Sequence, residues 1–170
     1  MEAKLVILPG DGIGPEVVGA AVEVLRSVES SFGHRFSLQE QMLGGCAINS
    51  YGTPLPEDTL AACQAADAIL LGAVGGPQWD DPQAEVRPEQ GLLALRKSLA
   101  LFANLRPVLP DINLLDASPI RPGLLQGVDL VVVRELTGDV YFGEPRLRRV
   151  VAGEIQAVDT MSYTESEVRR

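Results

Sequence analysis

Apolar positions recur along the chain with two spacings, one typical of strands and one typical of helices. The two kinds of segment follow each other, which predicts strands followed by helices. Residues 4–8 are mainly apolar and β-branched, and the run stops at Pro9, as expected of a buried strand. Residues 16–29 place apolar side chains at helical spacing, and Pro15 precedes them, where a first helical turn tolerates proline. The chain therefore begins with a strand that leads into a helix.

The same alternation continues over the rest of the chain. It predicts helices at residues 57–65 and about 90–100, and strands or extended segments at residues 36–43, 68–72, 101–105 and 128–134. Strands that alternate with helices predict an α/β fold with a mainly parallel sheet flanked by helices.

A helix-start signal stands close to the end of the chain. Thr164 and Glu167 have the spacing of a capping box, and the chain stops three residues later at Arg170. A helix of one turn is costly to nucleate, so we do not expect one to form here. The pattern favours a sequence that ends inside a larger architecture; a frayed natural C-terminus is the alternative.

Composition narrows the class of protein. The 170 residues are 46% hydrophobic and 22% charged, as in soluble globular proteins. No apolar run approaches the ~20 residues that span a bilayer, and no signal peptide precedes the first strand, so we expect a cytoplasmic protein without a membrane partner. The formal net charge of −9 argues against nucleic acid as a partner.

Few side chains are suited to soft metals. Cys46 and Cys63 are 17 residues apart and form no CxxC motif, and the only histidine, His34, falls in a predicted loop. This inventory supports neither a zinc site nor a disulfide framework, so we expect both cysteines to be small buried hydrophobes.

Three arginines stand at the ends of apolar segments and a tyrosine follows them: Arg96, Arg106, Arg134 and Tyr141. A guanidinium group can donate two parallel hydrogen bonds to one carboxylate. Three such groups with a phenol predict a pocket for a small molecule that carries more than one carboxylate. Any one of the arginines could instead be a solvated surface residue.

Two glycine-rich loops, residues 10–14 and 72–77, follow predicted strands. The first has the context of a dinucleotide-binding fingerprint, but its spacing is GxGxG and Pro15 follows it. Each loop would let backbone approach a ligand closely, or would simply form a tight turn. The loops alone do not predict a Rossmann fold.

Taken together, these segments resemble the β-decarboxylating dehydrogenases of the isocitrate/isopropylmalate dehydrogenase family, and most closely the members that act on isopropylmalate. The resemblance covers nearly the whole chain in order, with little of it between residues 107 and 125. It is carried by LPGDGIGPE at 8–16, LGAVGGPQW at 71–79, RPEQGLLALRK at 87–97, FANLRP at 102–107 and VRELTGDVYFGEPR at 133–146.

The resemblance implies two α/β domains with NAD and substrate between them. Residues 1–101 would begin the cofactor-binding domain, whose C-terminal half would be absent here. Residues 102–170 would begin the substrate and dimerisation domain. Its residues 147–163 would match an arm that pairs with a second subunit, so we expect a homodimer.

The resemblance also implies roles for single residues. The substrate's carboxylates would be bound by Arg96, Arg106 and Arg134, and Tyr141 would be the acid at the carbon that loses CO₂. Glu89 would lie near the nicotinamide ring, and Ile13 near the cofactor.

Leu92 and Leu93 indicate which substrate the family member takes. They precede Arg96 by four and three residues, so one helix face presents leucine beside arginine. Such a face suits an isopropyl group next to a carboxylate, whereas it would leave the third carboxylate of isocitrate buried and unpaired. Both leucines could instead be core residues, as we expect Leu95 to be.

The implied reaction is the NAD-dependent oxidative decarboxylation of 3-isopropylmalate, a step of leucine biosynthesis. NAD takes a hydride, Mg²⁺ or Mn²⁺ polarises the new carbonyl, and an acid protonates the enolate left by CO₂. In the family the metal ligands and the base, aspartates and a lysine, lie beyond the position of Arg170. We therefore assign no metal ligand to this chain and do not expect it to be active alone.

Two other functions stay open. A non-catalytic protein that binds a dicarboxylate or assists assembly would keep the arginine pocket without redox chemistry. A sister dehydrogenase acting on tartrate, malate or homoisocitrate would keep the chemistry and change the substrate.

Overall fold

The computed structural model describes residues 1–81, 84–138 and 141–170. The chain divides into two compact units, Met1–Leu99 and Ala100–Arg170, and each is described by itself. The boundary between the two units, after Leu99, lies two residues before the boundary predicted from the sequence. The roles assigned to the two domains stay predictions.

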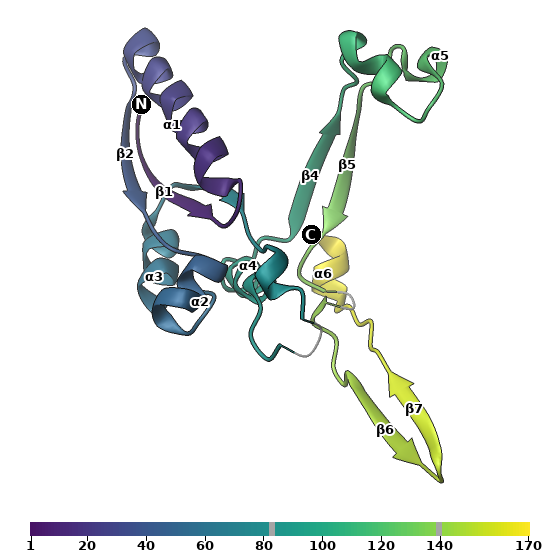
Figure 1. Ribbon diagram of the computed structural model, residues 1–170. Coiled ribbons are helices and arrows are strands. Elements are labelled where there is room, and N and C mark those ends of the chain that lie inside the picture. The colour runs from purple at the N-terminus through teal and green to yellow at the C-terminus, as the bar shows by residue number, and fades with distance from the viewer. Residues whose placement is uncertain (82–83, 139–140) are drawn as a thin grey trace. The chain divides into compact units, whose positions relative to one another are not determined.

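The first unit is built around a three-stranded parallel sheet in the order β2-β1-β3. Its central strand, β1, buries Val6, Ile7 and Leu8, which explains the apolar run seen in the sequence. Around the sheet lie the other elements of the unit (Figure 1). The strands are β1 (Glu2–Gly10), β2 (Arg35–Glu40) and β3 (Ala68–Ala73), and the helices are α1 (Gly14–Phe32), α2 (Gly45–Tyr51), α3 (Glu57–Ala65), the 3₁₀ turn η1 (Pro77–Trp79) and α4 (Pro88–Ser98).

The core of this unit joins its central strand, β1, to two helices that come later in the chain. Val6 and Leu8 from β1 cluster with Cys63 of α3 and Leu95 of α4. Leu43 completes the cluster from the loop after β2. The strand predicted at residues 36–43 therefore ends at Glu40, and Leu43 contributes burial without belonging to the sheet.

Glycines let α1 approach the sheet closely. A Cβ atom on Gly14 would overlap the carbonyl oxygen of Pro9 and lie 2.9 Å from the amide nitrogen of Ala73. A Cβ on Gly72 would lie 2.9 Å from a methyl group of Val18. The first turn of α1 therefore packs on strand backbone rather than on side chains.

We expect Gly14→Ala to destabilise the first unit by about 1–3 kcal/mol, because the new methyl group meets backbone that cannot rotate away. Gly19→Ala on the same helix is the matched control. Nothing lies within 4 Å of its added Cβ, so it is expected to stabilise the helix by about 0.5–1 kcal/mol. Thermal unfolding of the purified chain measures both, and equal effects at the two positions would contradict the packing argument.

The second unit contains two antiparallel strand pairs, β4 with β5 and β6 with β7. The bounds of its elements are β4 (Ala103–Val108), the 3₁₀ segment η2 (Ile112–Ala117), α5 (Pro122–Leu125), β5 (Leu130–Glu135), β6 (Leu147–Val151), β7 (Glu154–Val158) and α6 (Glu165–Arg169). Figure 1 shows β6 and β7 as a two-stranded ribbon, with the turn between them at Ala152 and Gly153.

The α/β class with a parallel sheet is confirmed, and the helix predicted at residues 57–65 coincides with α3. The sequence did not predict α2. The prediction that no helix forms at the chain end is wrong, since α6 spans Glu165–Arg169. Thr164 and Glu167 cap α6 reciprocally and Arg169 pairs with Glu165, which offsets the cost of a short helix.

No helix in the described part of the chain is long and apolar enough to cross a membrane.

Candidate functional site

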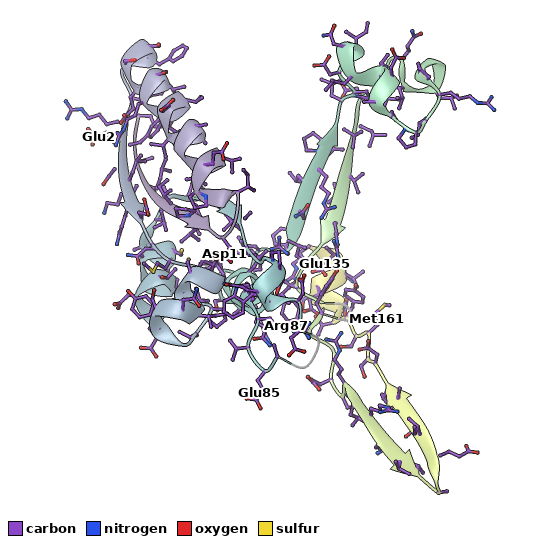
Figure 2. All side chains as sticks on the ribbon, viewed as in Figure 1. Glu2, Asp11, Glu85, Arg87, Glu135 and Met161 are labelled. Carbon is purple, nitrogen blue, oxygen red and sulfur yellow. The ribbon has the colours of Figure 1, made fainter. Side chains whose placement is uncertain are left out.

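Asp11 ties three segments of the first unit together at the carboxyl end of β1. Its Oδ2 accepts hydrogen bonds from the amide of Gly45 at 2.7 Å and from that of Gly75 at 2.8 Å. Its Oδ1 accepts from the amide of Cys46 at 2.7 Å. Figure 2 labels Asp11 in the loop that joins β1 to α1. One carboxylate thus connects this loop, the start of α2 and the loop after β3.

A cleft of about 420 Å³ opens beside this carboxylate. Gly10, Gly12 and Gly75 have positive φ angles of 73°, 56° and 99°, a conformation that favours glycine. No side chain projects from these three residues, so a ligand can approach their backbone closely. The cleft is lined by Gly10, Asp11, Gly12, Cys46, Asn49 and residues 75–79.

The two residues predicted to contact the cofactor, Ile13 and Glu89, both lie next to the segments that line this cleft. Ile13 is the residue before α1 and is 57% exposed. Glu89 belongs to the first turn of α4, and its Oε1 lies 2.8 Å from where a Cβ on Gly75 would stand. Of these two residues, Glu89 lies beside the Gly75 loop, whereas Ile13 adjoins the cleft only through its neighbour Gly12.

Helix α4 presents the residues predicted to select the substrate. Leu95 is 3% exposed and belongs to the core, as predicted. Leu92, Leu93 and Arg96 are only half-buried. Leu95 therefore packs α4 against the core. The leucine–arginine face of the helix, formed by Leu92, Leu93 and Arg96, stays partly accessible to solvent.

Arg106 and Arg134 lie on one face of the β4–β5 pair in the second unit. Arg106 pairs with Val132, and Arg134 pairs with Asn104. Since alternate residues of a strand share a face, the two arginines are diagonal neighbours. Nε of Arg106 donates to Oδ1 of Asn104 at 2.9 Å, which holds the first guanidinium beside the second.

Tyr141 lies against Arg134. The Nη2 atom of Arg134 donates a hydrogen bond to the Tyr141 hydroxyl oxygen, and the guanidinium carbon is 5.2 Å from the ring centroid. The tyrosine stays 41% exposed. The phenol oxygen accepts from Arg134 while its O–H stays available to donate to a ligand.

Glu135, next in the chain after Arg134, organises the turn that leads to Tyr141. Its carboxylate accepts hydrogen bonds from the Thr137 hydroxyl, from the Thr137 amide at 2.8 Å and from the Gly138 amide at 3.0 Å. Arg170 pairs with it at 3.2 Å. Partial burial raises the pKa of Glu135, but these hydrogen bonds and the Arg170 charge outweigh it and the pKa is lowered.

The lowered pKa of Glu135 predicts acid sensitivity of the second unit. Its stabilisation is complete above the ordinary pKa of 4.5 and is lost as the pH falls through the lower folded value. Glu135→Gln should therefore be less stable than the parent chain at neutral pH, and its free energy of unfolding should change less between neutral pH and about pH 3. Urea unfolding at both pH values measures this. Glu154→Gln, the same change on exposed β7, is the control, and an equal response of both variants would refute the prediction.

The structure brings together some of the predicted site residues and assigns others to separate units. Glu89 lies beside Gly75 in the first unit, and Ile13 follows Gly12, which lines the cleft. Arg106, Arg134 and Tyr141 form one cluster in the second unit. Arg96 belongs to the first unit with Leu92 and Leu93.

The sequence analysis did not single out Asp11 or Glu135. An aspartate between two glycines after a strand is a signal for Asp11. Glu135 accepts from the amides of Thr137 and Gly138, two and three residues later in the chain. This short spacing between a carboxylate and the amides it binds can be read from the sequence.

Among residues 1–81, 84–138 and 141–170, no group of three or more His, Cys, Asp or Glu side chains is arranged to hold a metal ion. Asp139, one of the aspartates not assigned to metal, lies outside the described residues. Burial raises the pKa of both thiols, Cys46 and Cys63. Cys63 is buried, as predicted, but the prediction is wrong for Cys46, which is half-buried and lines the cleft.

Comparison with known sequences gives close relatives over the full chain. The family described as isocitrate/isopropylmalate dehydrogenase matches residues 4–170. The 3-isopropylmalate dehydrogenase of Anaeromyxobacter dehalogenans is 61% identical over 100% of this chain and 48% of its own length. That of Halalkalibacterium halodurans is 58% identical over 100% of this chain and 47% of its own length. The chain thus spans about half the length of the curated relatives it matches.

Solved structures share the fold. A β-decarboxylating dehydrogenase of Thermococcus kodakarensis superposes with a TM-score of 0.59 at 32% identity, over 94% of this chain and 40% of that one. The isocitrate dehydrogenase of Methylococcus capsulatus superposes with a TM-score of 0.71 at 29% identity, over 96% of this chain and 43% of that one.

Proposed function

Because this chain belongs to the isocitrate/isopropylmalate dehydrogenase family, we propose that it forms the N-terminal part of an NAD-dependent 3-isopropylmalate dehydrogenase of leucine biosynthesis. The observation that carries the choice of substrate is the face of α4, where half-buried Leu92 and Leu93 accompany Arg96 while Leu95 alone enters the core. An apolar branch beside a carboxylate is the chemistry that this face would recognise.

The proposed substrate is a small dicarboxylate, held by three guanidinium groups. Arg106 and Arg134 share one strand-pair face, so they can bind one carboxylate group from the same side. Arg96 would add a third positive charge from α4. In a chain with a formal net charge of −9, these arginines would concentrate positive charge where the substrate binds.

The proposed cofactor site is the glycine-lined cleft of the first unit, with Glu89 beside Gly75 and Ile13 next to Gly12. NAD bound there would accept the hydride from the hydroxyl-bearing carbon of the substrate. The cleft's own contribution is to let backbone approach the dinucleotide. Tyr141, with Arg134 hydrogen-bonded to its oxygen, would give a proton to the carbon that has lost CO₂.

The proposed reaction also uses Mg²⁺ or Mn²⁺, for which the described residues supply no ligand group. We therefore do not expect the chain alone to complete the reaction.

We also propose a cytoplasmic homodimer in which the β6–β7 ribbon pairs with a second subunit. Val150 and Ile155 face each other across the ribbon and are 70% and 63% exposed, so an apolar surface is available for pairing.

The decisive experiment supplies the remaining part of the enzyme. In a chimera, this chain replaces the matching segment of the Anaeromyxobacter dehalogenans enzyme, which is 61% identical to it. Absorbance of NADH is followed with 3-isopropylmalate, NAD⁺ and Mg²⁺, for the chimera and for the 170-residue chain alone. We expect turnover by the chimera only.

Other outcomes separate the alternatives. A chimera that prefers tartrate, malate or homoisocitrate would assign the chain to a sister dehydrogenase. A chimera that binds a dicarboxylate without turning it over would favour the non-catalytic function. Turnover by the chain alone would mean that its own residues supply the base and metal ligands, and would overturn the assigned roles.

A further inference from the structure

Asp11 makes more hydrogen bonds to distant segments of the first unit than the turn between β1 and α1 requires. Its carboxylate accepts from Gly45, Cys46 and Gly75, which are 34, 35 and 64 residues away. Its own amide donates to the carbonyl of Ala73 at 2.7 Å. The side chain and the backbone of one residue thus hold both the start of α2 and the end of β3.

The start of α2 depends on this carboxylate. The first amides of a helix have no partner within the helix, and the residue before α2, Gly44, has no side chain to cap them. Asp11 accepts from two of these amides, those of Gly45 and Cys46, and so caps α2 from another segment. A negative charge also interacts favourably with the amino end of a helix.

The loop after β3 depends on it as well. Gly75 adopts a φ angle of 99°, which favours glycine, and its amide donates to Oδ2 of Asp11 at 2.8 Å. A Cβ on Gly75 would lie 2.8 Å from Oε1 of Glu89. The Gly75 backbone therefore has two carboxylates near it: Asp11, which accepts its amide hydrogen bond, and Glu89 from α4.

There is little room for these segments to shift while Asp11 is in place. A Cβ on Gly44 would lie 2.6 Å from Oδ2 of Asp11, and a Cβ on Gly45 would overlap the indole nitrogen of Trp79. Trp79 and Gly75 both line the 420 Å³ cleft, as does Asp11 itself. The carboxylate therefore sets the spacing between the walls of the cleft.

From this arrangement we infer that Asp11 is a positioning residue for dinucleotide binding: by tying the Gly75 loop to α2, it holds the cofactor cleft in its binding shape. The inference rests on the proposed function for the identity of the ligand. Asp11 acts through backbone amides, so it needs no contact with the cofactor. Its removal should weaken dinucleotide binding and leave the leucine–arginine face of α4, anchored through Leu95, in place.

Asp11→Asn is the primary variant. The amide keeps the shape of the side chain but replaces one acceptor oxygen with an NH₂ donor, which then faces a backbone N–H. Asp67→Asn is the matched control. Asp67 also accepts from a backbone amide, that of Lys4 at 2.7 Å, and it precedes β3 at the opposite end of that strand from the Gly75 loop.

The first measurement is amide hydrogen exchange in the 170-residue chain. In Asp11→Asn, exchange at Gly45, Cys46 and Gly75 is expected to accelerate at least about tenfold, because a hydrogen-bonded amide must open before it exchanges. In Asp67→Asn, only the amide of Lys4 should respond. Unchanged exchange at Gly75 in Asp11→Asn would overturn the inference.

The second measurement is NADH affinity of the chimera by isothermal titration, with KM for each substrate determined in parallel. Asp11→Asn is expected to raise the Kd for NADH and the KM for NAD⁺ about tenfold or more, while the KM for isopropylmalate stays within about twofold. Asp67→Asn should change neither. A rise of both KM values together would indicate a general structural role and would overturn the inference.

Gly75→Ala tests the same loop without altering Asp11. Its methyl group would meet Glu89 in a backbone conformation that alanine rarely adopts. NADH binding should weaken, while the Gly45 and Cys46 amides stay protected. If the parent chimera binds NADH but does not oxidise isopropylmalate, the proposed substrate is wrong and this inference stands; if it does not bind NADH, the inference fails.

Discussion

Replacing Tyr141 with phenylalanine is expected to lower kcat of the chimera by about 10²–10⁴-fold, the usual contribution of a positioned general acid. The change removes only the hydroxyl that accepts the hydrogen bond from Arg134. The ring, and its position 5.2 Å from the guanidinium carbon, can be kept. Substrate binding should change little, because the carboxylates are assigned to the arginines.

The control for this prediction is Tyr51→Phe. Tyr51 lies at the end of α2 and is 63% exposed, and no substrate contact is assigned to it. Steady-state kinetics of both variants with 3-isopropylmalate and NAD⁺ give the comparison. If Tyr141→Phe keeps full kcat, the proton must come from another group and the role assigned to Tyr141 is wrong.

Replacing Leu92 and Leu93 together with serine is expected to lower kcat/KM for 3-isopropylmalate by about a hundredfold relative to unbranched malate. Each lost apolar contact to the isopropyl group is worth about 1–3 kcal/mol in transition-state binding. Both leucines are half-buried on α4, so serine can replace them without entering the core. The relevant quantity is the ratio of kcat/KM for the two substrates, measured in the chimera.

Ala94→Ser provides the control on the same helix. Ala94 is exposed and lies between Leu93 and the core residue Leu95, so the substitution adds a hydroxyl to α4 away from the proposed substrate face. It should leave the ratio unchanged. An unchanged ratio in the double leucine variant would mean that the isopropyl group is recognised elsewhere, or that this chain prefers a different dicarboxylate.

Local patterns predicted much of the fold because they report on burial within one element. The apolar run of β1 is buried in the sheet, and the residues of α3 coincide with the predicted helix. The short helix α2 was missed. Its seven residues have no cap of their own and depend on Asp11, which precedes the helix by more than thirty residues.

The chain end shows the opposite case. The spacing of Thr164 and Glu167 is typical of a helix start, but the cost of nucleating so short a helix led to the prediction that none forms. In the folded chain α6 forms, with Arg170 beyond its last turn paired to Glu135 and its guanidinium carbon 5.3 Å from the ring centroid of Phe102. These contacts of Arg170 with distant residues stabilise α6 in addition to its own cap. Helix propensity, which is a local property, does not include such contacts.

The sequence by itself determined the α/β class, the strands and longer helices of the first unit, and the residue types able to bind carboxylates and donate a proton. Only the tertiary structure decided which of these residues meet. The register of β4 with β5 puts Arg106 and Arg134 on one face, and Asp11 joins segments up to 64 residues apart. Periodicity is a property of one element and can be read along the chain, whereas a hydrogen bond between distant segments exists only once the backbone has brought donor and acceptor within about 3 Å.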